Sequence, residues 1–245
     1  MAAETGIHIA LAPSILGHIG SFPITSTLLT SWLVVFALVA FAVIFNRTLK
    51  LVPGRGQVAV EFTVGFIYDY IKETLDDSEV LTRRYFPLIM TIFIYILASD
   101  LISLLPFVGH VITLRDMPLF YPVNTDLNVT LALAVIAFIT IEFAGITVLG
   151  VFRYAGKFVN LHSILGFIIG IIELISEVAR LITFSFRLFG NIFAGKVLIL
   201  LALAFIPYLL PVPLLVYEVF VGVIQAAIFA LLTLFFIKIA VSEPH

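Results

Sequence analysis

The stretch LITFSFRLFGNIFAGKVL, residues 181–198, decides the fold, because it sets one arginine inside an otherwise apolar run. No proline occurs between Pro122 and Pro207, so the run predicts a helix in lipid. An arginine at the centre of a bilayer costs about 2.5–3.5 kcal/mol or more. Its guanidinium cannot shed its proton to escape that cost. Arg187 must therefore face a water-filled cavity or a carboxylate, which makes it the first candidate functional residue.

The composition of the 245-residue chain indicates an integral membrane protein. Hydrophobic residues make up 62% and charged residues 11%, whereas soluble domains have about 25% charged residues. No stretch outside the apolar runs is long enough for a soluble domain, so we expect one membrane domain over residues 1–245. The net charge of −2 argues against nucleic-acid binding. Cysteine is absent and the histidines are scattered, so we expect neither a metal site nor a cofactor.

The apolar pattern predicts an all-α protein. Its segments are a spanning helix at 28–46, an amphipathic surface helix at 54–81, a transmembrane hairpin of 85–108 and 126–152, and two long, strongly tilted helices at 163–206 and 209–242. A solvated helix is the alternative for 54–81. Residues 1–26 are expected to form a loop or a brief interfacial helix, and 153–162 a short basic turn.

Segment 163–206 is too long for an ordinary span. As one helix it would measure about 66 Å, against a hydrocarbon core of about 30 Å. Membrane helices ordinarily tilt by no more than about 40° from the membrane normal. A helix of this length would have to tilt further, toward the plane of the membrane. Two spans with a tight turn are the alternative. No proline marks such a turn, so the sequence favours one oblique helix.

Basic residues predict the orientation. Of the 13 Lys and Arg, nine lie in the loop 46–85, in the turn 153–157 and near the C-terminus, while the opposite side has only Arg115. The other three fall inside membrane segments. The positive-inside rule then predicts an N-terminus outside and a C-terminus in the cytoplasm. The first residues lack the basic stretch of a signal peptide, so we expect the N-terminus to be retained.

Polar side chains form a stripe beside Arg187. Those within about 80° of it on a helical wheel, over about five turns, are Glu173, Ser176, Glu177, Arg180, Thr183 and Asn191. Lys196 points to the opposite side and must meet another neighbour. On the last helix Glu218 and Gln225 are seven residues apart and share a face.

Some of these groups have a purely structural interpretation. Two ion pairs are possible, Glu177 with Arg180 and Glu218 with Lys196. For Asp100 and Glu142, single acids near helix ends, capping or interfacial exposure is the favoured reading. Arg187 differs, because no acid lies three or four residues from it on its own helix.

The motif FRLFGNIFAG, residues 186–195, resembles the signature of subunit a of F-type ATP synthases. Four further stretches agree in order: VPGRGQVAVEF (52–62), DLISLLP (100–106), TDLNVTLALA (125–134) and IQAAIFALLT (224–233). The resemblance covers nearly the whole chain.

This resemblance implies the stator subunit of a rotary proton motor, with no catalytic chemistry of its own. Two offset aqueous half-channels would reach the carboxylates of a c-subunit ring, and Arg187 would separate them. The implied partners are the c-ring, b-type peripheral stalk subunits, the remainder of the synthase and the lipid bilayer. The implied location is a bacterial inner (plasma) membrane.

The resemblance also assigns residues to the two paths. Those of the outer half-channel are Glu218, Lys196, Asn191, Gln225 and Asp100. Those of the cytoplasmic half-channel are Glu173, Glu177, Ser176 and Thr183. This chain departs from the family pattern by having lysine at 196 opposite glutamate at 218, where a glutamate and a histidine are common. Whether Lys196 carries protons or only sets the local field is open, as is the choice between protons and sodium.

Two other classes of function remain as alternatives. A secondary transporter or ion channel with an intramembrane Arg–Glu gate predicts inverted repeats and helices broken at Gly/Pro pairs, and neither is visible in the sequence. A purely structural membrane scaffold leaves the polar stripe around Arg187 unexplained.

Overall fold

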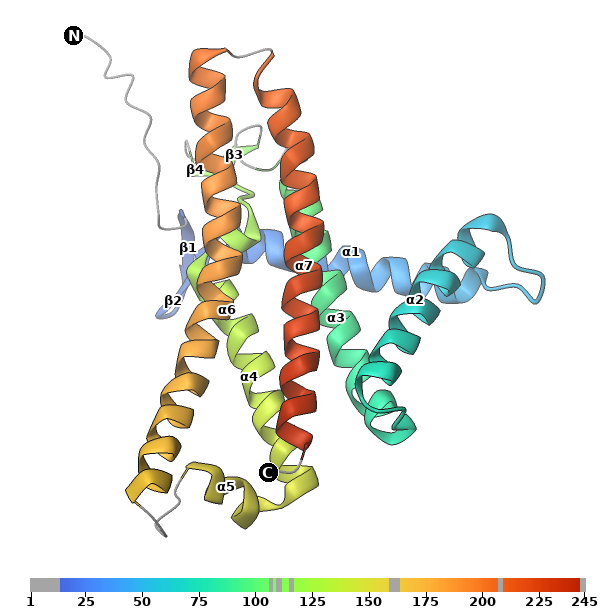
Figure 1. Cartoon of the computed structure of the whole chain (residues 1–245). Helices are drawn as coiled ribbons and strands as arrows, with labels where there is room; N and C mark the ends of the chain where they lie inside the picture. Colours follow the sequence, from blue (N-terminus) through green and yellow to red (C-terminus); the bar gives the residue numbers. More distant parts are fainter. Residues whose placement is uncertain are drawn as a thin grey trace.

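The chain folds into a bundle of helices (Figure 1). The computed structural model describes residues 14–105, 108, 112–114, 117–158, 164–206 and 209–242. The α-helices in these residues are α1 Ser26–Thr48, α2 Arg55–Thr74, α3 Glu79–Ser103, α4 Leu127–Leu149, α5 Val151–Phe158, α6 Ile164–Phe205 and α7 Pro211–Val241. Five of these helices (α1, α3, α4, α6 and α7) are long and apolar enough to cross a membrane. The protein is therefore an all-α membrane protein.

The chain before α1 forms a β-hairpin, so the expectation of a loop or an interfacial helix was wrong for this stretch. Strand β1, Ile15–Ile19, pairs antiparallel with β2, Phe22–Thr25. Gly20 lies in the tight turn between them with φ +63°, a conformation that glycine adopts without strain. A second, shorter hairpin pairs β3, Thr113–Leu114, with β4, Met117–Pro118. Residues 1–13 and Arg115 lie outside the described residues.

Hydrogen bonds fix the start of α1 against the start of α4. The hydroxyl of Thr25 caps α1 by accepting from the Leu28 amide, at 3.2 Å. Thr27 donates its hydroxyl to Asp126 Oδ2 at 2.6 Å, and Asp126 itself caps α4 through the Asn128 amide. These groups are buried, so the contacts tie the two helix ends together in a place that water does not reach.

The predicted surface helix 54–81 is divided in the structure. α2 ends at Thr74, and α3 begins at Glu79 rather than at 85. Asp76 and Asp77 between them have φ of 54° and 58°, a left-handed conformation that aspartate tolerates better than most residues. Ser78 then caps α3 by accepting from the Leu81 amide. The Asp-Asp-Ser sequence is thus the turn that reverses the chain.

The second helix of the predicted hairpin is shorter than expected. α4 ends at Leu149, and Gly150 follows with φ +81°. A separate helix, α5, then occupies residues for which the sequence suggested a basic turn. Residues 159–163, which include the rest of that turn and the predicted start of the next helix, lie outside the described residues.

α6 is a single unbroken helix, the first of the two arrangements considered for this segment. Its 42 residues correspond to a length of about 63 Å. Figure 1 shows α6 and α7 running alongside each other, while α1 runs across the pair. α4 packs against both α6 and α7. One core cluster joins α2, α3, α4 and α7 around Ile89, Ile141 and Leu234, and another joins α3, α4, α6 and α7 around Ile96, Leu188 and Phe229.

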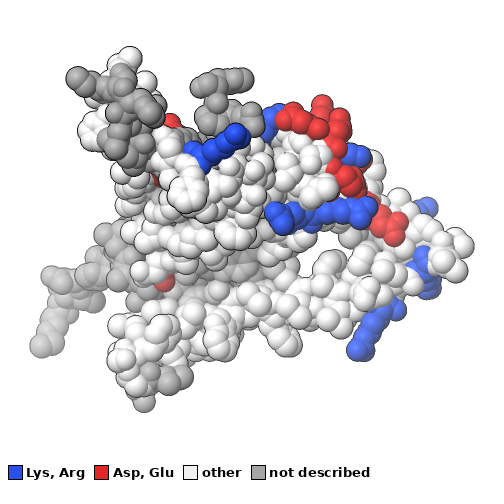
Figure 2. All heavy atoms as spheres, turned by 90° about the horizontal axis from the view of Figure 1, so that it is seen from below, with Lys and Arg blue, Asp and Glu red and all other residues white. Residues whose placement is uncertain are grey.

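The surface of the bundle is largely apolar. Large hydrophobic side chains such as Trp32, Phe36 and Phe205 are exposed, as expected for a surface that meets lipid. In Figure 2, Lys, Arg, Asp and Glu side chains gather toward the side occupied by α2 and the turn that follows it. Ion pairs join some of them, including Lys72 with Glu79 at 3.6 Å and Lys238 with Asp76 at 2.8 Å. On the face seen in Figure 2, the charged side chains of the described residues are therefore concentrated near α2.

Candidate functional site in the membrane helices

Arg187 lies on α6 at the border between a buried and an exposed face. Phe184 and Leu188 beside it are buried in the core, whereas Thr183 and Asn191, one turn away in each direction, are exposed. Among the described residues, no hydrogen bond or ion pair reaches the guanidinium. A permanent charge on a membrane helix needs a partner. The guanidinium is therefore available to water or to a group beyond the described residues.

A small cavity with a mainly apolar lining and a few polar groups lies between α6 and α7, and it begins at Asn191, one turn of α6 beyond Arg187. Its volume is about 180 Å³, and its lining includes Asn191, Gly195 and Glu218. Glu218 is 5% exposed, and neither of its carboxylate oxygens has a hydrogen-bond partner in the described chain. A Cβ at Gly195 would come within 3.3 Å of Glu218 Oε1, so glycine allows the two helices to approach here. Gln225 is buried on the same face of α7.

A second polar cluster joins α3 to α6 and α7. Lys196 Nζ donates to the Ser103 carbonyl oxygen at 3.1 Å, and Ser103 Oγ donates to the Asp100 carbonyl oxygen at 2.6 Å. Asn124, in the short 3-10 helix Val123–Thr125 (η2), donates to Asp100 Oδ1 at 2.7 Å. The Asp100 side chain faces α7, because a Cβ at Gly222 would lie 3.0 Å from Asp100 Cβ.

These contacts correct two expectations. Asp100 is 4% exposed, and its Oδ2 has no hydrogen-bond partner in the described chain, so it neither caps a helix nor lies at the interface. Lys196 and Glu218 are both in the described part of the chain, and no ion pair joins them. The sequence alone could not predict that Lys196 would instead donate a hydrogen bond to a backbone carbonyl oxygen of α3.

The polar groups of the first half of α6 separate into two sets. Glu177 is buried and forms an ion pair with Arg180 at 2.7 Å, while the Arg180 guanidinium lies 3.8 Å from the centre of the Phe236 ring on α7. Ser176 and Thr183 are exposed instead, and Thr183 donates to the Ala179 carbonyl oxygen. Glu173 is half-buried and is engaged in an interaction. The ion pair proposed as the structural interpretation of Glu177 and Arg180 is thus present.

Some residues of these clusters were missed in the sequence. Asn124 was not singled out, although it lies just before the TDLNVT stretch that supported the resemblance. Glu142 accepts a hydrogen bond from the Tyr154 hydroxyl at 2.9 Å instead of capping a helix. Burial raises the pKa of Tyr154, and the hydrogen bond to Glu142 raises it further, so the phenol keeps its proton and remains a donor.

Fold and site together define a class, that of polytopic helical membrane proteins with ionisable groups held between their membrane helices. The family model described as ATP synthase A chain matches residues 28–238. The chain belongs to this family. It is accordingly a bacterial membrane protein and part of the proton-translocating sector of an ATP synthase.

Individual relatives agree with the family assignment. An ATP synthase subunit a of Geobacter sulfurreducens is 33% identical over 215 residues, covering 88% of this chain and 87% of that protein. One from Moorella thermoacetica is 32% identical over 220 residues, covering 90% of this chain and 92% of that protein. One from Legionella pneumophila is 34% identical over 223 residues, covering 89% of this chain and 87% of that protein.

Proposed function

We propose that the chain is the stator subunit of the rotary proton motor. It forms two offset aqueous half-channels that lead to the carboxylates of a c-subunit ring, and Arg187 separates the two. The observation that carries the proposal is the Arg187 guanidinium, which has no partner within the described chain and borders an exposed face of α6. The other proposed partners are b-type stalk subunits and the remainder of the synthase.

Arg187 acts in this proposal as a fixed positive charge. A ring carboxylate that passes it is held ionised, because an opposite charge nearby favours the charged form. A proton cannot hop past a guanidinium that keeps its own proton. Each proton moving down 100 mV releases about 2.3 kcal/mol, so leakage between the half-channels would dissipate that energy without rotation.

The outer half-channel runs through the space between α6 and α7. The cavity lined by Asn191 and Glu218 supports this route, because it brings an amide and a carboxylate together between the two helices, and Asn191 is one turn of α6 from Arg187. Glu218 is the proton carrier in this cavity, and Gln225 lies two turns further along the same face of α7, toward the level of Arg187. Asp100 and Lys196 lie deeper, in the cluster with Ser103, where they set the field around Glu218.

The cytoplasmic half-channel follows the exposed polar groups of the first half of α6. Glu173, Ser176 and Thr183 line it. Glu177 contributes through its charge, since its carboxylate is already bound to Arg180. That pair joins two residues of one helix, so it does not form a gate between two parts that could separate, as the alternative of a gated transporter or channel would require.

The distribution of basic residues supports the proposed orientation. α1 spans the membrane with its N-terminus outside, and the chain ends in the cytoplasm. The charged side chains that gather near α2 then face the cytoplasm (Figure 2). Figure 1 shows α6 and α7 running across α1, which supports the proposal that this pair is strongly tilted when α1 spans the membrane. A tilted pair can follow the flank of a ring.

The test replaces Arg187 with alanine in the complete enzyme. ATP-driven proton pumping into inverted membrane vesicles is expected to be abolished, while the amount of assembled enzyme is unchanged. Ile169→Ala is the matched control, because Ile169 is exposed on the same side of α6 and carries no charge. Normal pumping by the Arg187→Ala enzyme would refute the role assigned to the arginine.

A further inference from the structure

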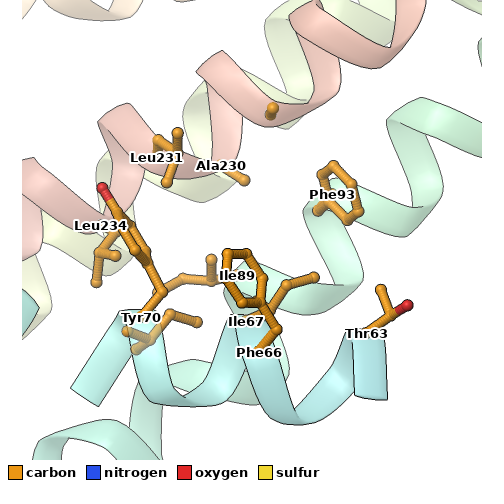
Figure 3. A pocket seen from close by; sticks show the side chains of 11 residues that line it. Thr63, Phe66, Ile67, Tyr70, Ile89, Phe93, Ala230, Leu231 and Leu234 are labelled. Carbon is orange, nitrogen blue, oxygen red and sulfur yellow. The ribbon is translucent and has the colours of Figure 1, made fainter. Parts of the chain in front are cut away.

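An apolar cavity lies between the amphipathic helix α2 and the membrane helices α3 and α7. Its volume is about 430 Å³. Figure 3 shows the side chains that surround it, among them Phe66 and Tyr70 of α2, Phe93 of α3, and Leu231 of α7. Phe66 is 65% exposed and Tyr70 37% exposed, so the cavity opens to the surroundings along α2. None of the residues proposed for the two half-channels lines it.

Water is an unsuitable occupant. A space of this size could hold on the order of ten water molecules at about 30 Å³ each, but an ordered water needs two to four polar partners. Of the lining side chains, Thr63 and Tyr70 carry polar atoms. The Thr63 hydroxyl is already bound to the Ala59 carbonyl oxygen at 2.9 Å. The body of the cavity therefore suits a hydrocarbon chain.

Hydrogen-bond donors lie toward one end of this apolar space. On α7 the lining residues Ala227, Leu231 and Leu234 recur at helical spacing, and Lys238 is the next member of the row. Its ammonium is partly exposed and contacts Asp76 Oδ1 at 2.8 Å, which leaves donors unused. The Tyr70 hydroxyl makes no hydrogen bond within the described chain and lies on the α7 side of the cavity (Figure 3).

We propose that this cavity binds a membrane phospholipid, with one acyl chain between α2, α3 and α7 and its phosphate at Lys238 and Tyr70. An amphiphile matches the site, because the lining is apolar along its length, and the ammonium of Lys238, which its contact with Asp76 leaves with unused donors, lies at the rim with the Tyr70 hydroxyl. The α2 helix would then be held against the bundle partly by lipid. The proposal does not depend on the path of protons, so its test does not either.

The experiment uses the complete, purified enzyme in lipid nanodiscs that contain a phospholipid with a photoactivatable group at the end of one acyl chain. Irradiation followed by peptide mapping is expected to label residues of the cavity, such as Phe66 and Phe93. Ala227→Phe fills the cavity and is expected to lose this labelling. Ala132→Phe, the same substitution at an exposed position of α4, keeps it.

A second pair of variants tests the headgroup. Lys238→Ala is expected to reduce labelling of the cavity about fivefold, the factor that corresponds to about 1 kcal/mol for one basic residue near a phosphate. Arg84→Ala removes an exposed charge on α3 and leaves labelling unchanged. Labelling that survives Ala227→Phe would overturn the proposal. So would crosslinking of a photoreactive residue at position 66 to another subunit of the enzyme, which would identify a protein helix as the occupant.

Discussion

Two arginines on α6 lie seven residues apart and nearly on the same side of the helix, yet they have opposite surroundings. Arg180 is bound by Glu177 and lies against Phe236, so its charge is fully used within the chain. Arg187 has no partner in the described residues. The difference between them shows that a charge on a membrane helix can either be paired within the chain or remain available to a binding partner.

The largest effect on stability is expected at the paired arginine. Arg180→Ala removes the ion-pair partner of the buried Glu177 carboxylate, and breaking a buried ion pair typically destabilises a protein by about 3–5 kcal/mol. Thermal unfolding of the solubilised enzyme should therefore occur at a lower temperature, whereas Arg187→Ala should change stability by less than about 0.5 kcal/mol. The double variant Glu177→Gln with Arg180→Gln should recover most of the loss. Equal destabilisation by the two alanine variants would contradict the distinction.

The next effect concerns Glu218, the buried carboxylate in the cavity between α6 and α7. Glu218→Gln preserves the shape of the side chain but cannot take up a proton, and proton carriers of this kind typically contribute at least about 100-fold to a rate. Passive proton flow through the membrane sector, measured after removal of the catalytic head, should fall by about that factor. Glu142→Gln, whose carboxylate is bound by Tyr154, is the control and should retain flow. An unchanged rate in Glu218→Gln would show that protons on the outer path do not pass through Glu218.

A smaller effect is expected where helices meet closely. Gly222→Val would push α7 away from Asp100, since even a Cβ would lie 3.0 Å from Asp100 Cβ. Overpacking of this kind costs about 1–3 kcal/mol, to be measured as a lower unfolding temperature. Gly65→Val on α2 is the matched control, because a Cβ there meets nothing within 4 Å. If both variants lost stability equally, the contact between α3 and α7 would not be the cause.

The smallest effect is expected at the contact between α4 and α5. Tyr154→Phe removes the hydroxyl that donates to Glu142 and should cost about 1 kcal/mol. Proteolysis of the α4–α5 junction in membrane vesicles, followed over time, would report the loosening of α5. Tyr217→Phe, an exposed tyrosine of α7, should not change the cleavage rate. Unaltered cleavage in Tyr154→Phe would show that α5 is held by other contacts.

What could be predicted from the sequence was determined by local energetics. The apolar runs identify the membrane helices, and the exclusion of unpaired charge from lipid marks Arg187 and the stripe around it. The end of α2 was also signalled locally by Asp76, Asp77 and Ser78, but the helical pattern running through them concealed it.

What could not be predicted depends on contacts between distant segments. The burial of Asp100 comes from Asn124 and Gly222, which approach it from η2 and α7. The partner of Lys196 is a backbone carbonyl of α3, a group that every residue has and that no residue type signals. Helical-wheel arithmetic gave the direction of Lys196, but only the packed bundle shows what lies there.

The continuity of α6 has a geometric consequence. Glu173 and Lys196 lie on one rod without a hinge, so their separation of about 35 Å is fixed by residue count and not by loop conformation. Insertion of a single residue between them would rotate the following side chains by about 100° around the helix axis. Deletion of seven residues would instead keep their direction around the axis to within about 20° and shorten the helix by about 10 Å. Angular register and spacing along this helix can therefore be altered separately.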